Sequence, residues 1–310
     1  SLVVRVGEAY FEALLTSDQL ALALAQKDTY TTQLDAARKG FAAGTGTRTD
    51  VDEAQARLDM TVAQELEARQ NVEFTRRRLD VLTGQSATAL AQLDVAGFTP
   101  VVPAPNSVDA WIERAEQSSP ELQSLRAQLE AAQQEIKKNQ AGHLPTLDAI
   151  AQWARTNSDN VTSVNSRYDN KVIGLQLSIP LYAGGQVSST VRQAVATQER
   201  VQEMIEATRR DLGVRVHREF RGVTEGIARI KALQQAVYSA EQAVLSNRKS
   251  FQAGSRTTLD VLNAEQQKTV ALRDLAQARY LYLVSHLRLQ SLAGEDRQAS
   301  IALANRWLVP

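Results

Sequence analysis

One ten-residue segment occurs twice in this chain of 310 residues, each time between long stretches of helical apolar spacing. Residues 41–50 read Phe-Ala-Ala-Gly-Thr-Gly-Thr-Arg-Thr-Asp, and residues 251–260 read Phe-Gln-Ala-Gly-Ser-Arg-Thr-Thr-Leu-Asp. The offset between the copies is 251 − 41 = 210 residues, and it relates residues 38–84 to residues 248–294 without a gap. Because glycine and threonine interrupt helices, each copy is predicted to be the tip of a helical hairpin. The chain is therefore predicted to be a duplication of one long helical hairpin.

The helices that flank these tips are predicted to be very long. Apolar residues recur at spacings of three and four over residues 2–40, 50–82, 186–250 and 258–292, and Asp50 suits the N-cap of the second stretch. At about 1.5 Å per residue, the ~65 residues of the third stretch would span roughly 100 Å. No globular core has that dimension, so these helices must lie side by side. The low content of aromatic residues, proline and glycine agrees with long helices.

A change of composition separates the two repeats. Prolines exclude a helix from residues 98–105, so residues 85–117 are predicted to be a connector that includes a short helix capped by Ser107. The chain is therefore expected to contain a first repeat at 1–84, this connector, a second repeat at 118–294 and a C-terminal tail at 295–310. The tail is predicted to pack against the connector through Ile301, Leu303, Trp307 and Leu308.

Two segments, 144–156 and 171–182, change from helical spacing to alternating apolar and polar residues. Because such alternation is typical of strands with one apolar face, residues 144–182 are predicted to form a β-hairpin. Each strand has about 10–13 residues, the length that a tilted membrane-spanning strand needs, whereas strands of soluble sheets average about 5–6. A half-buried hairpin in a soluble sheet is the alternative, but the chain offers no sheet for it to join. The face predicted to meet the membrane carries Leu147, Ala149, Ala151, Trp153, Ile173, Leu175, Leu177 and Ile179.

Charge and residue content exclude several classes of function. Lys+Arg and Asp+Glu are both 35, so no net charge favours nucleic acid. Cys is absent and the three His residues stand apart, so we expect neither a thiolate nor a histidine metal site. No run of about 18 apolar residues predicts a transmembrane helix. No pattern of nucleophile and base is present, so we expect neither an enzyme nor a cofactor.

The polar residues of the tips allow more than one interpretation. Asp50, Asp52 and Glu53 fall in a first helical turn, where carboxylates cap a helix and complement its dipole. A metal-dependent enzyme that uses this acidic turn is an alternative, and it would bind divalent ions tightly. In the second tip, Arg256 and Asp260 lie four residues apart, although a hairpin turn requires neither. They and Asp50 are predicted to form charge-assisted bonds between neighbouring hairpins, and an ordinary solvated loop remains an open alternative.

Together, these motifs resemble those of the TolC family of outer-membrane efflux and secretion ducts. The resemblance rests on the repeated Phe-x-Ala-Gly-x-x-Thr-x-x-Asp-Val tips, on Leu144-Pro145 at the start of a strand, and on the Ile-Pro-Leu-Tyr-Ala-Gly-Gly of residues 179–185. It implies a mainly α fold of long antiparallel coiled-coil hairpins in two tandem repeats, with a membrane β-hairpin. Three chains would form an α-barrel in the periplasm and a β-barrel in the outer membrane.

The resemblance also implies roles for the tip residues. In the family, an Arg and an aromatic residue of the second tip link to an Asp of the first tip and close the tunnel, and these positions match Arg256, Phe251 and Asp50. Phe251 stands where the best-known member has Tyr, so a link through a hydroxyl is absent. The family's acidic constriction matches Asp260, and its second acidic position is Asn263 here, so a single ring of charge would favour cations weakly. The surface that docks a periplasmic adaptor matches Gly44, Thr47, Gly254 and Thr257.

The function that the resemblance implies is that of a passive, gated exit duct in the outer membrane of a Gram-negative bacterium. Its partners would be two further copies of the chain, outer-membrane lipid, a periplasmic adaptor, and an inner-membrane ABC or RND transporter. A soluble periplasmic coiled-coil adaptor or scaffold is the alternative, although the sequence shows no small β-domain of the kind that adaptors carry. The exported substrate stays open among protein toxins, drugs and metals.

The chain departs from the family in its strands. Family protomers carry two strand hairpins, whereas this sequence predicts only the second, so three chains would supply 3 × 2 = 6 strands. The offset of 210 residues also relates Leu2 to Leu212, which lies inside a predicted helix. We therefore expect the chain to begin part-way through its first repeat, with the first strand hairpin upstream of Ser1.

Overall fold

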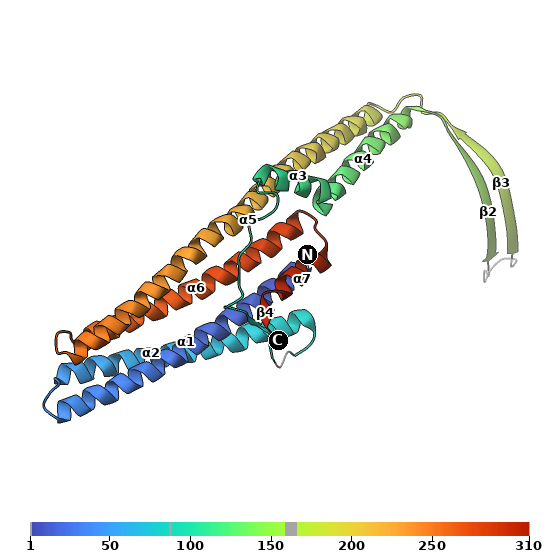
Figure 1. The fold of residues 1–310 in the computed structure, drawn as a ribbon. Helices are drawn as coiled ribbons and strands as arrows, with labels where there is room; N and C mark the ends of the chain where they lie inside the picture. The colour runs from blue at the N-terminus through green and yellow to red at the C-terminus, as the bar shows by residue number, and fades with distance from the viewer. Residues whose placement is uncertain (1, 87–88, 159–165, 310) are drawn as a thin grey trace. The chain divides into compact units, whose positions relative to one another are not determined.

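The computed structural model describes residues 2–86, 89–158 and 166–309 (Figure 1). It is mainly helical, which confirms the fold class expected from the sequence. Within these ranges, no helix combines the length and the apolarity that crossing a lipid bilayer requires. The helices are α1 (Leu2–Ala42), α2 (Arg48–Thr83), α3 (Val108–Ser118), α4 (Pro120–Gln140), α5 (Gln186–Gln252), α6 (Thr258–Leu292), α7 (Arg297–Asn305) and the 3-10 helix η1 (Ala141–His143). The strands are β1 (Gln92–Leu93), β2 (Thr146–Ser158), β3 (Ser166–Ser178) and β4 (Leu308–Val309).

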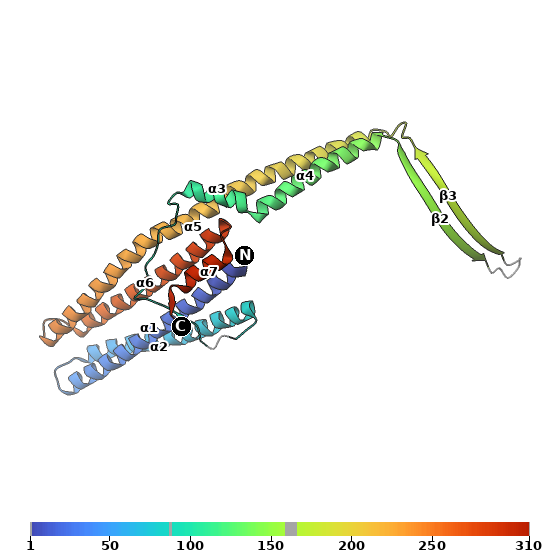
Figure 2. The same ribbon diagram turned by 45° about the vertical axis from the view of Figure 1, so that its right-hand side comes forward.

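The first of two compact units, residues 1–119 and 212–310, is built around α1. α1 lies beside α2 and also beside α6, as both views of the ribbon show (Figures 1 and 2). Small residues are buried in these helices, since Ala13 and Ala54 are 0% exposed. Because the distance between two packed helices depends on the side chains at the contact, alanine allows a close approach. Larger buried side chains fill the remaining space, among them Tyr30, Leu34, Leu79, Leu262 and Leu289.

The connector and the C-terminal tail meet in an aromatic cluster on α6. The ring centroid of Trp307, in the tail, lies 5.8 Å from that of Phe98, in the connector, and 6.1 Å from that of Tyr282. His286 completes the cluster at 5.9 Å from Trp307, and all four side chains are buried. The Tyr282 hydroxyl also donates to the carbonyl of Val101 at 2.9 Å. Edge-to-face rings and this hydrogen bond fix the connector on α6.

A two-residue strand pair joins the same two segments. β1 pairs antiparallel with β4, so that Leu93 lies opposite Leu308. The tail therefore packs against the connector, as expected, through Trp307 and Leu308. Ile301 adds little burial because it is 43% exposed, and the side chain of Leu303 lies outside the described part of the chain. Strands of two residues are too short to show alternation, so the sequence did not predict them.

The second unit, residues 120–211, contains α4, the strand hairpin and the first part of α5. Pro120 opens α4 at the position where a missing N–H is harmless, because first-turn amides have no partner within a helix. α4 lies beside the first part of α5 in both views (Figures 1 and 2). The buried apolar residues of these two segments include Leu122, Leu125 and Val201.

β2 and β3 form a long antiparallel hairpin whose register agrees with the expected apolar face. The register pairs residues of that face with one another: Leu147 with Leu177, Ala149 with Leu175, and Ala151 with Ile173. These side chains share one face because alternate residues of a strand point the same way. Their large members are 61–91% exposed, so the face has no partner within this chain's described residues. The role of this face in a membrane stays a prediction.

The strand boundaries differ from the expected ones. β3 ends at Ser178 rather than at residue 182, so placing Ile179 in the strand was wrong. Pro180 explains the difference, because proline has no N–H for a neighbouring strand and restricts the residue before it. At the other end, the strands take in part of the expected polar loop, and residues 159–165 lie outside the described ranges.

Two glycines that the duplication relates, Gly84 and Gly294, have the same left-handed φ of 70° but different surroundings. A Cβ at Gly84 would meet no atom within 4 Å, whereas a Cβ at Gly294 would lie 2.4 Å from Ser118 Cβ. We expect Gly84→Ala to lower the free energy of unfolding by about 1–2 kcal/mol through backbone strain, and Gly294→Ala by about 1–3 kcal/mol more through the clash. Denaturant unfolding of the two variants checks this, and equal losses would show that Ser118 moves aside without cost.

Candidate functional site at the hairpin tips

The two tips have the same backbone structure. Gly44 and Gly254 adopt the left-handed conformation that favours glycine, with φ of 73° and 76°. The Gly44 amide donates to the Phe41 carbonyl at 3.0 Å, and the Gly254 amide donates to the Phe251 carbonyl at 2.9 Å. In both tips, the amide of the following residue donates to the carbonyl five positions earlier, at 2.9 Å. The duplication seen in the sequence therefore extends to the hydrogen bonds of the turns.

A capping box follows each turn. Thr47 is the N-cap of α2, since its hydroxyl accepts from the Asp50 amide at 3.2 Å and its amide donates to the Asp50 carboxylate at 2.9 Å. Thr257 and Asp260 form the same pair at the start of α6, at 3.3 Å and 2.9 Å. The expectation that Asp50 is the N-cap is therefore wrong. α2 begins two residues earlier, at Arg48, because Thr47 supplies the capping hydroxyl and Asp50 completes the box from the first turn.

Both tip carboxylates are held in the charged form. The Thr47 hydroxyl, followed by the Thr47 amide, lowers the pKa of Asp50 below its usual range. The Thr257 amide is the largest cause of the lowered pKa of Asp260, followed by the Thr257 hydroxyl and then by the charge of Arg256. Nowhere in the described chain are three or more His, Cys, Asp or Glu side chains grouped so that they could hold a metal ion.

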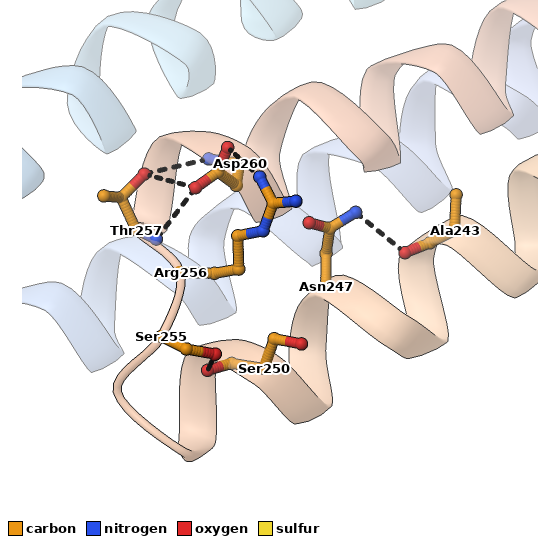
Figure 3. Close-up of polar contacts among 7 residues, drawn as sticks. All are labelled: Ala243, Asn247, Ser250, Ser255, Arg256, Thr257 and Asp260. Atoms are coloured by element: carbon orange, nitrogen blue, oxygen red, sulfur yellow. Dashed lines mark hydrogen bonds and ion pairs between the residues drawn. The ribbon is translucent and has the colours of Figure 1, made fainter.

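Arg256 turns toward the carboxylate of its own tip (Figure 3). Its Nη1 lies 3.4 Å from Asp260 Oδ1. Gly46 occupies the equivalent position of the first tip, so the second tip carries a cation there that the first lacks. Asp50, the partner expected for Arg256, is instead close enough to Thr258 of the second tip for a side-chain hydrogen bond that further lowers its pKa. A bond between Arg256 and Asp50 of a neighbouring protomer stays a prediction.

The other candidate residues of the tips face solvent. Phe251, at the end of α5, is 45% exposed. The expected adaptor-docking residues, which form the outer ends of the turns, are likewise exposed: Gly44, Thr47, Gly254 and Thr257. Their roles as an aromatic link and as a docking surface stay predictions, because both roles depend on contacts with other chains.

A contact that the sequence did not predict joins the two hairpins near the tips. Arg57 of α2 donates from Nη2 to Asn263 Oδ1 at 3.0 Å and from Nη1 to Gln266 Oε1. Asn263, the neutral residue at the expected second constriction position, is thus bonded to the first repeat. The offset of 210 residues relates Arg57 to Gln267, so the duplication carries no signal for this contact.

A second pair of contacts does have a signal in the sequence. Arg38 donates to Gln55 at 2.9 Å, and Arg248 forms an ion pair with Glu265. Both pairs are separated by 17 residues, and the offset of 210 relates one pair to the other. This repeated spacing across a predicted turn could have identified both contacts. The first tip therefore has a neutral amide where the second has a buried carboxylate, Glu265, which is 7% exposed.

The fold and the tips define a class of protein with two tandem helical hairpins, capped turns and one amphipathic strand hairpin. Comparison with protein families identifies the class more closely. The profile described as outer membrane efflux protein matches residues 1–85 and 111–295. The chain belongs to the outer membrane efflux protein family, which confirms the resemblance inferred from the motifs.

Individual relatives agree with this family. The chain is 37% identical over 309 residues to the alkaline protease secretion protein AprF of Pseudomonas aeruginosa, covering 97% of this chain and 63% of AprF. It is 33% identical over 322 residues to the outer membrane protein TolC of Escherichia coli, covering 100% of this chain and 65% of TolC. The crystal structure of VceC from Vibrio cholerae has the same fold, with a TM-score of 0.78 at 20% identity over 95% of this chain and 70% of VceC. The chain spans less than two thirds of the length of AprF and TolC.

The capping boxes predict how the tips respond to acid. Because the folded-state pKa values of Asp50 and Asp260 are lowered, the stability that these groups contribute is complete above the ordinary Asp pKa of about 4. It is lost as the pH falls through the lower, folded-state value. Hydrogen–deuterium exchange of residues 39–54 and 249–264, corrected for intrinsic rates, should therefore stay constant from neutral pH to about pH 5 and rise below about pH 4.

Threonine variants provide the controls for this experiment. Thr47→Ala and Thr257→Ala should each weaken this response in the tip that carries the change, since loss of an N-cap costs about 0.5–2 kcal/mol. Thr49→Ala lies beside Asp50 but outside the box, and it should behave like the unchanged protein. A rise in exchange that is equal along whole helices on acidification would contradict a local origin at the capping boxes.

Proposed function

We propose that this protein is the exit duct of a tripartite export system in the outer membrane of a Gram-negative bacterium. Three copies form a passive channel through which substrate passes from an inner-membrane transporter and a periplasmic adaptor to the exterior. The gate lies at the hairpin tips. One observation carries the proposal: a chain of the outer membrane efflux protein family presents a strand hairpin with an exposed apolar face.

The strand hairpin has the pattern of a surface that meets lipid. Along its apolar face, the aliphatic pairs are followed by Trp153, whose Nε1 donates to Asp169 at 2.6 Å, and then by the Arg155–Asp169 ion pair at 3.1 Å. Membrane barrels likewise present an apolar band to lipid, bordered by aromatic residues at the interface. The opposite face of the hairpin is more polar and suits a water-filled lumen, with Asp148, Gln152, Asn170 and Gln176.

Two strands cannot cross a membrane by themselves. β2 and β3 form a two-stranded sheet, so each has an outer edge whose backbone groups have no strand partner among the residues that the structure describes. In lipid, each unsatisfied backbone group costs several kcal/mol, so only a closed barrel is stable there. Strands from elsewhere must therefore complete the sheet, and this requirement supports assembly of the protein as a homotrimer.

The alternative functions fit the same observations less well. A soluble periplasmic adaptor or scaffold has no use for an exposed apolar strand face. A metal-dependent enzyme fits poorly because the Asp50 carboxylate is bonded to Thr47 and Asp52 is paired with Arg48 at 3.0 Å. We therefore do not assign a catalytic activity to this acidic turn.

The partners and the cargo follow from the same proposal. We propose that the exposed tips dock a periplasmic adaptor, which connects the duct to an inner-membrane transporter of the ABC or RND class. Among the possible cargoes, the likeness to AprF, a protease secretion protein, favours a secreted protein.

This proposal predicts a detergent-dependent trimer. The protein should stay in the membrane fraction after a salt wash, require detergent for extraction, and run as a trimer that heating converts to monomer. Leu175→Asp should reduce insertion and trimer yield, because charge on the lipid face of a barrel is destabilising. Gln176→Asp, on the opposite face, is the matched control and should leave both intact. A monomer that stays soluble without detergent would remove the proposal and support the adaptor alternative.

The gate assignment predicts the effect of Arg256→Ser. The change removes the expected bond to Asp50 of a neighbouring protomer and frees Asp260, which Arg256 contacts at 3.4 Å. We expect a higher single-channel conductance in planar bilayers and a stronger preference for cations. Exposed ion pairs are weak, so three of them bias the gate without locking it. Arg48→Ser breaks the exposed pair with Asp52 in the first tip and serves as control; unchanged conductance for Arg256→Ser would exclude Arg256 from the gate.

A further inference from the structure

Arg57 bridges the two hairpins close to the tips. It lies ten residues after Thr47 (57 − 47 = 10), and Asn263 lies six residues after Thr257 (263 − 257 = 6). The guanidinium donates through Nη2 to Asn263 Oδ1 at 3.0 Å and through Nη1 to Gln266 Oε1. Asn263 and Gln266 are three residues apart, so they are neighbours on one face of α6. The planar fork of an arginine binds two such acceptors in a fixed geometry, which a lysine cannot do.

Beyond this contact, on the side away from the tips, a groove separates α2 from α6. A groove of about 420 Å³ lies between α1, α2 and α6, and Gln266 is one of its lining residues. The other lining residues are largely polar, including Gln26, Gln64, Asn71 and Thr269. The Arg57 side chain therefore joins helices of different hairpins next to a largely polar groove.

Among the described residues, Asp50 also approaches Thr258 at the tips themselves, and two further side-chain bonds join α1 to α6. Tyr280 of α6 donates to Asp18 of α1 at 2.7 Å, and Arg288 of α6 pairs with Glu8 of α1 at 2.6 Å. Both start at least 17 residues further along α6 than Asn263 (280 − 263 = 17). These two bonds hold the hairpins together far from the turns, whereas Arg57, like Asp50, acts near the end that a gate must move.

Arg57 also changes the charge near the predicted constriction. Asp260 and Asn263 lie one helical turn apart on α6, so a guanidinium bonded to Asn263 is close to the acidic ring. Its positive charge would oppose the attraction of Asp260 for cations, since the potentials of nearby charges add. The neutral Asn263 and the cationic Arg57 would therefore both reduce the preference for cations at the predicted constriction.

We propose that Arg57 is a gate residue with two roles: an intramolecular latch that holds the start of α6 against α2, and a charge that reduces cation selectivity. This inference rests on the proposed function, because a gate and a selectivity exist only in a channel. Unlike the expected bond between Arg256 and Asp50, the latch lies within one protomer. Opening would then require each protomer to release its own latch as well as its contacts with neighbours.

Crosslinking tests the latch without using channel activity. The chain contains no cysteine, so Arg57→Cys combined with Asn263→Cys introduces the only two thiols of the sequence given. A short bismaleimide should link them within one protomer, and a denaturing gel should show a compacted monomer with no covalent dimer. The pair Asp50→Cys and Arg256→Cys should give covalent dimers and trimers in addition to any link within one protomer. Covalent dimers from the Arg57 and Asn263 pair, or no link at all, would overturn the intramolecular latch.

Conductance and reversal potential in planar bilayers separate the two roles. Arg57→Gln should raise conductance and shift the reversal potential toward cations, whereas Arg57→Lys should raise conductance with little shift because the charge stays. Asn263→Ala with Gln266→Ala should raise conductance as Arg57→Gln does, and all three changes together should raise it no further. Arg76→Gln, an exposed arginine on the same helix, is the matched control and should alter neither quantity.

The outcomes distinguish the latch from the proposed function. Each variant is first shown to form heat-sensitive trimers, so misfolding is recognised before recording. If trimers conduct but Arg57→Gln matches the unchanged protein in conductance and reversal potential, the latch is overturned and the duct stands. Additive effects of Arg57→Gln and the two alanine changes would also overturn it. If the unchanged protein forms neither trimers nor channels, the proposed function fails, and this inference fails with it.

Discussion

The packing of α1 against both α2 and α6 is the contact on which the first unit depends, because helices of this length have no globular core to cover them. Small buried residues such as Ala13 and Ala54 allow the close approach, and polar side chains then set its register. Glu65 of α2 is 6% exposed and is paired with Lys27 of α1 and Arg69 of α2, each at 2.7 Å. A buried carboxylate without partners would be costly, so these pairs favour one alignment of the hairpin over shifted ones.

The turns show a duplicated backbone whose charges have diverged. Both copies keep the left-handed glycine and the Thr-to-Asp capping box, since these fix the shape of the turn. Residue types differ at positions that the geometry of the turn does not restrict. Gly46 corresponds to Arg256, and Gln55 corresponds to Glu265. The second tip thus carries a cation and a buried carboxylate that the first lacks, while α2 of the first hairpin contributes Arg57 to a contact with α6. The two hairpins are alike in structure but not interchangeable in chemistry.

Local features of the fold were predictable to within a few residues. The α6 boundaries match the expected 258–292, and the strand alternation anticipated which side chains face each other in the hairpin. Errors arose where one residue overrides a periodic pattern, as Pro180 does in ending β3 early. The sequence also predicts Asp50 as the cap of α2, whereas Thr47, three residues earlier, supplies the capping hydroxyl and Asp50 lies in the first turn.

By itself, the sequence determined the duplication, the two turns, the long helices and the amphipathic strands, because spacings of a few residues specify each of them. Tertiary structure alone decided that Arg57 binds Asn263, 206 residues away, and that Trp307 joins Phe98 and Tyr282 in one cluster. Neither contact leaves a periodic pattern. Both arise only when tertiary packing brings distant side chains within hydrogen-bonding or van der Waals distance, and the candidate gate depends on contacts of that kind.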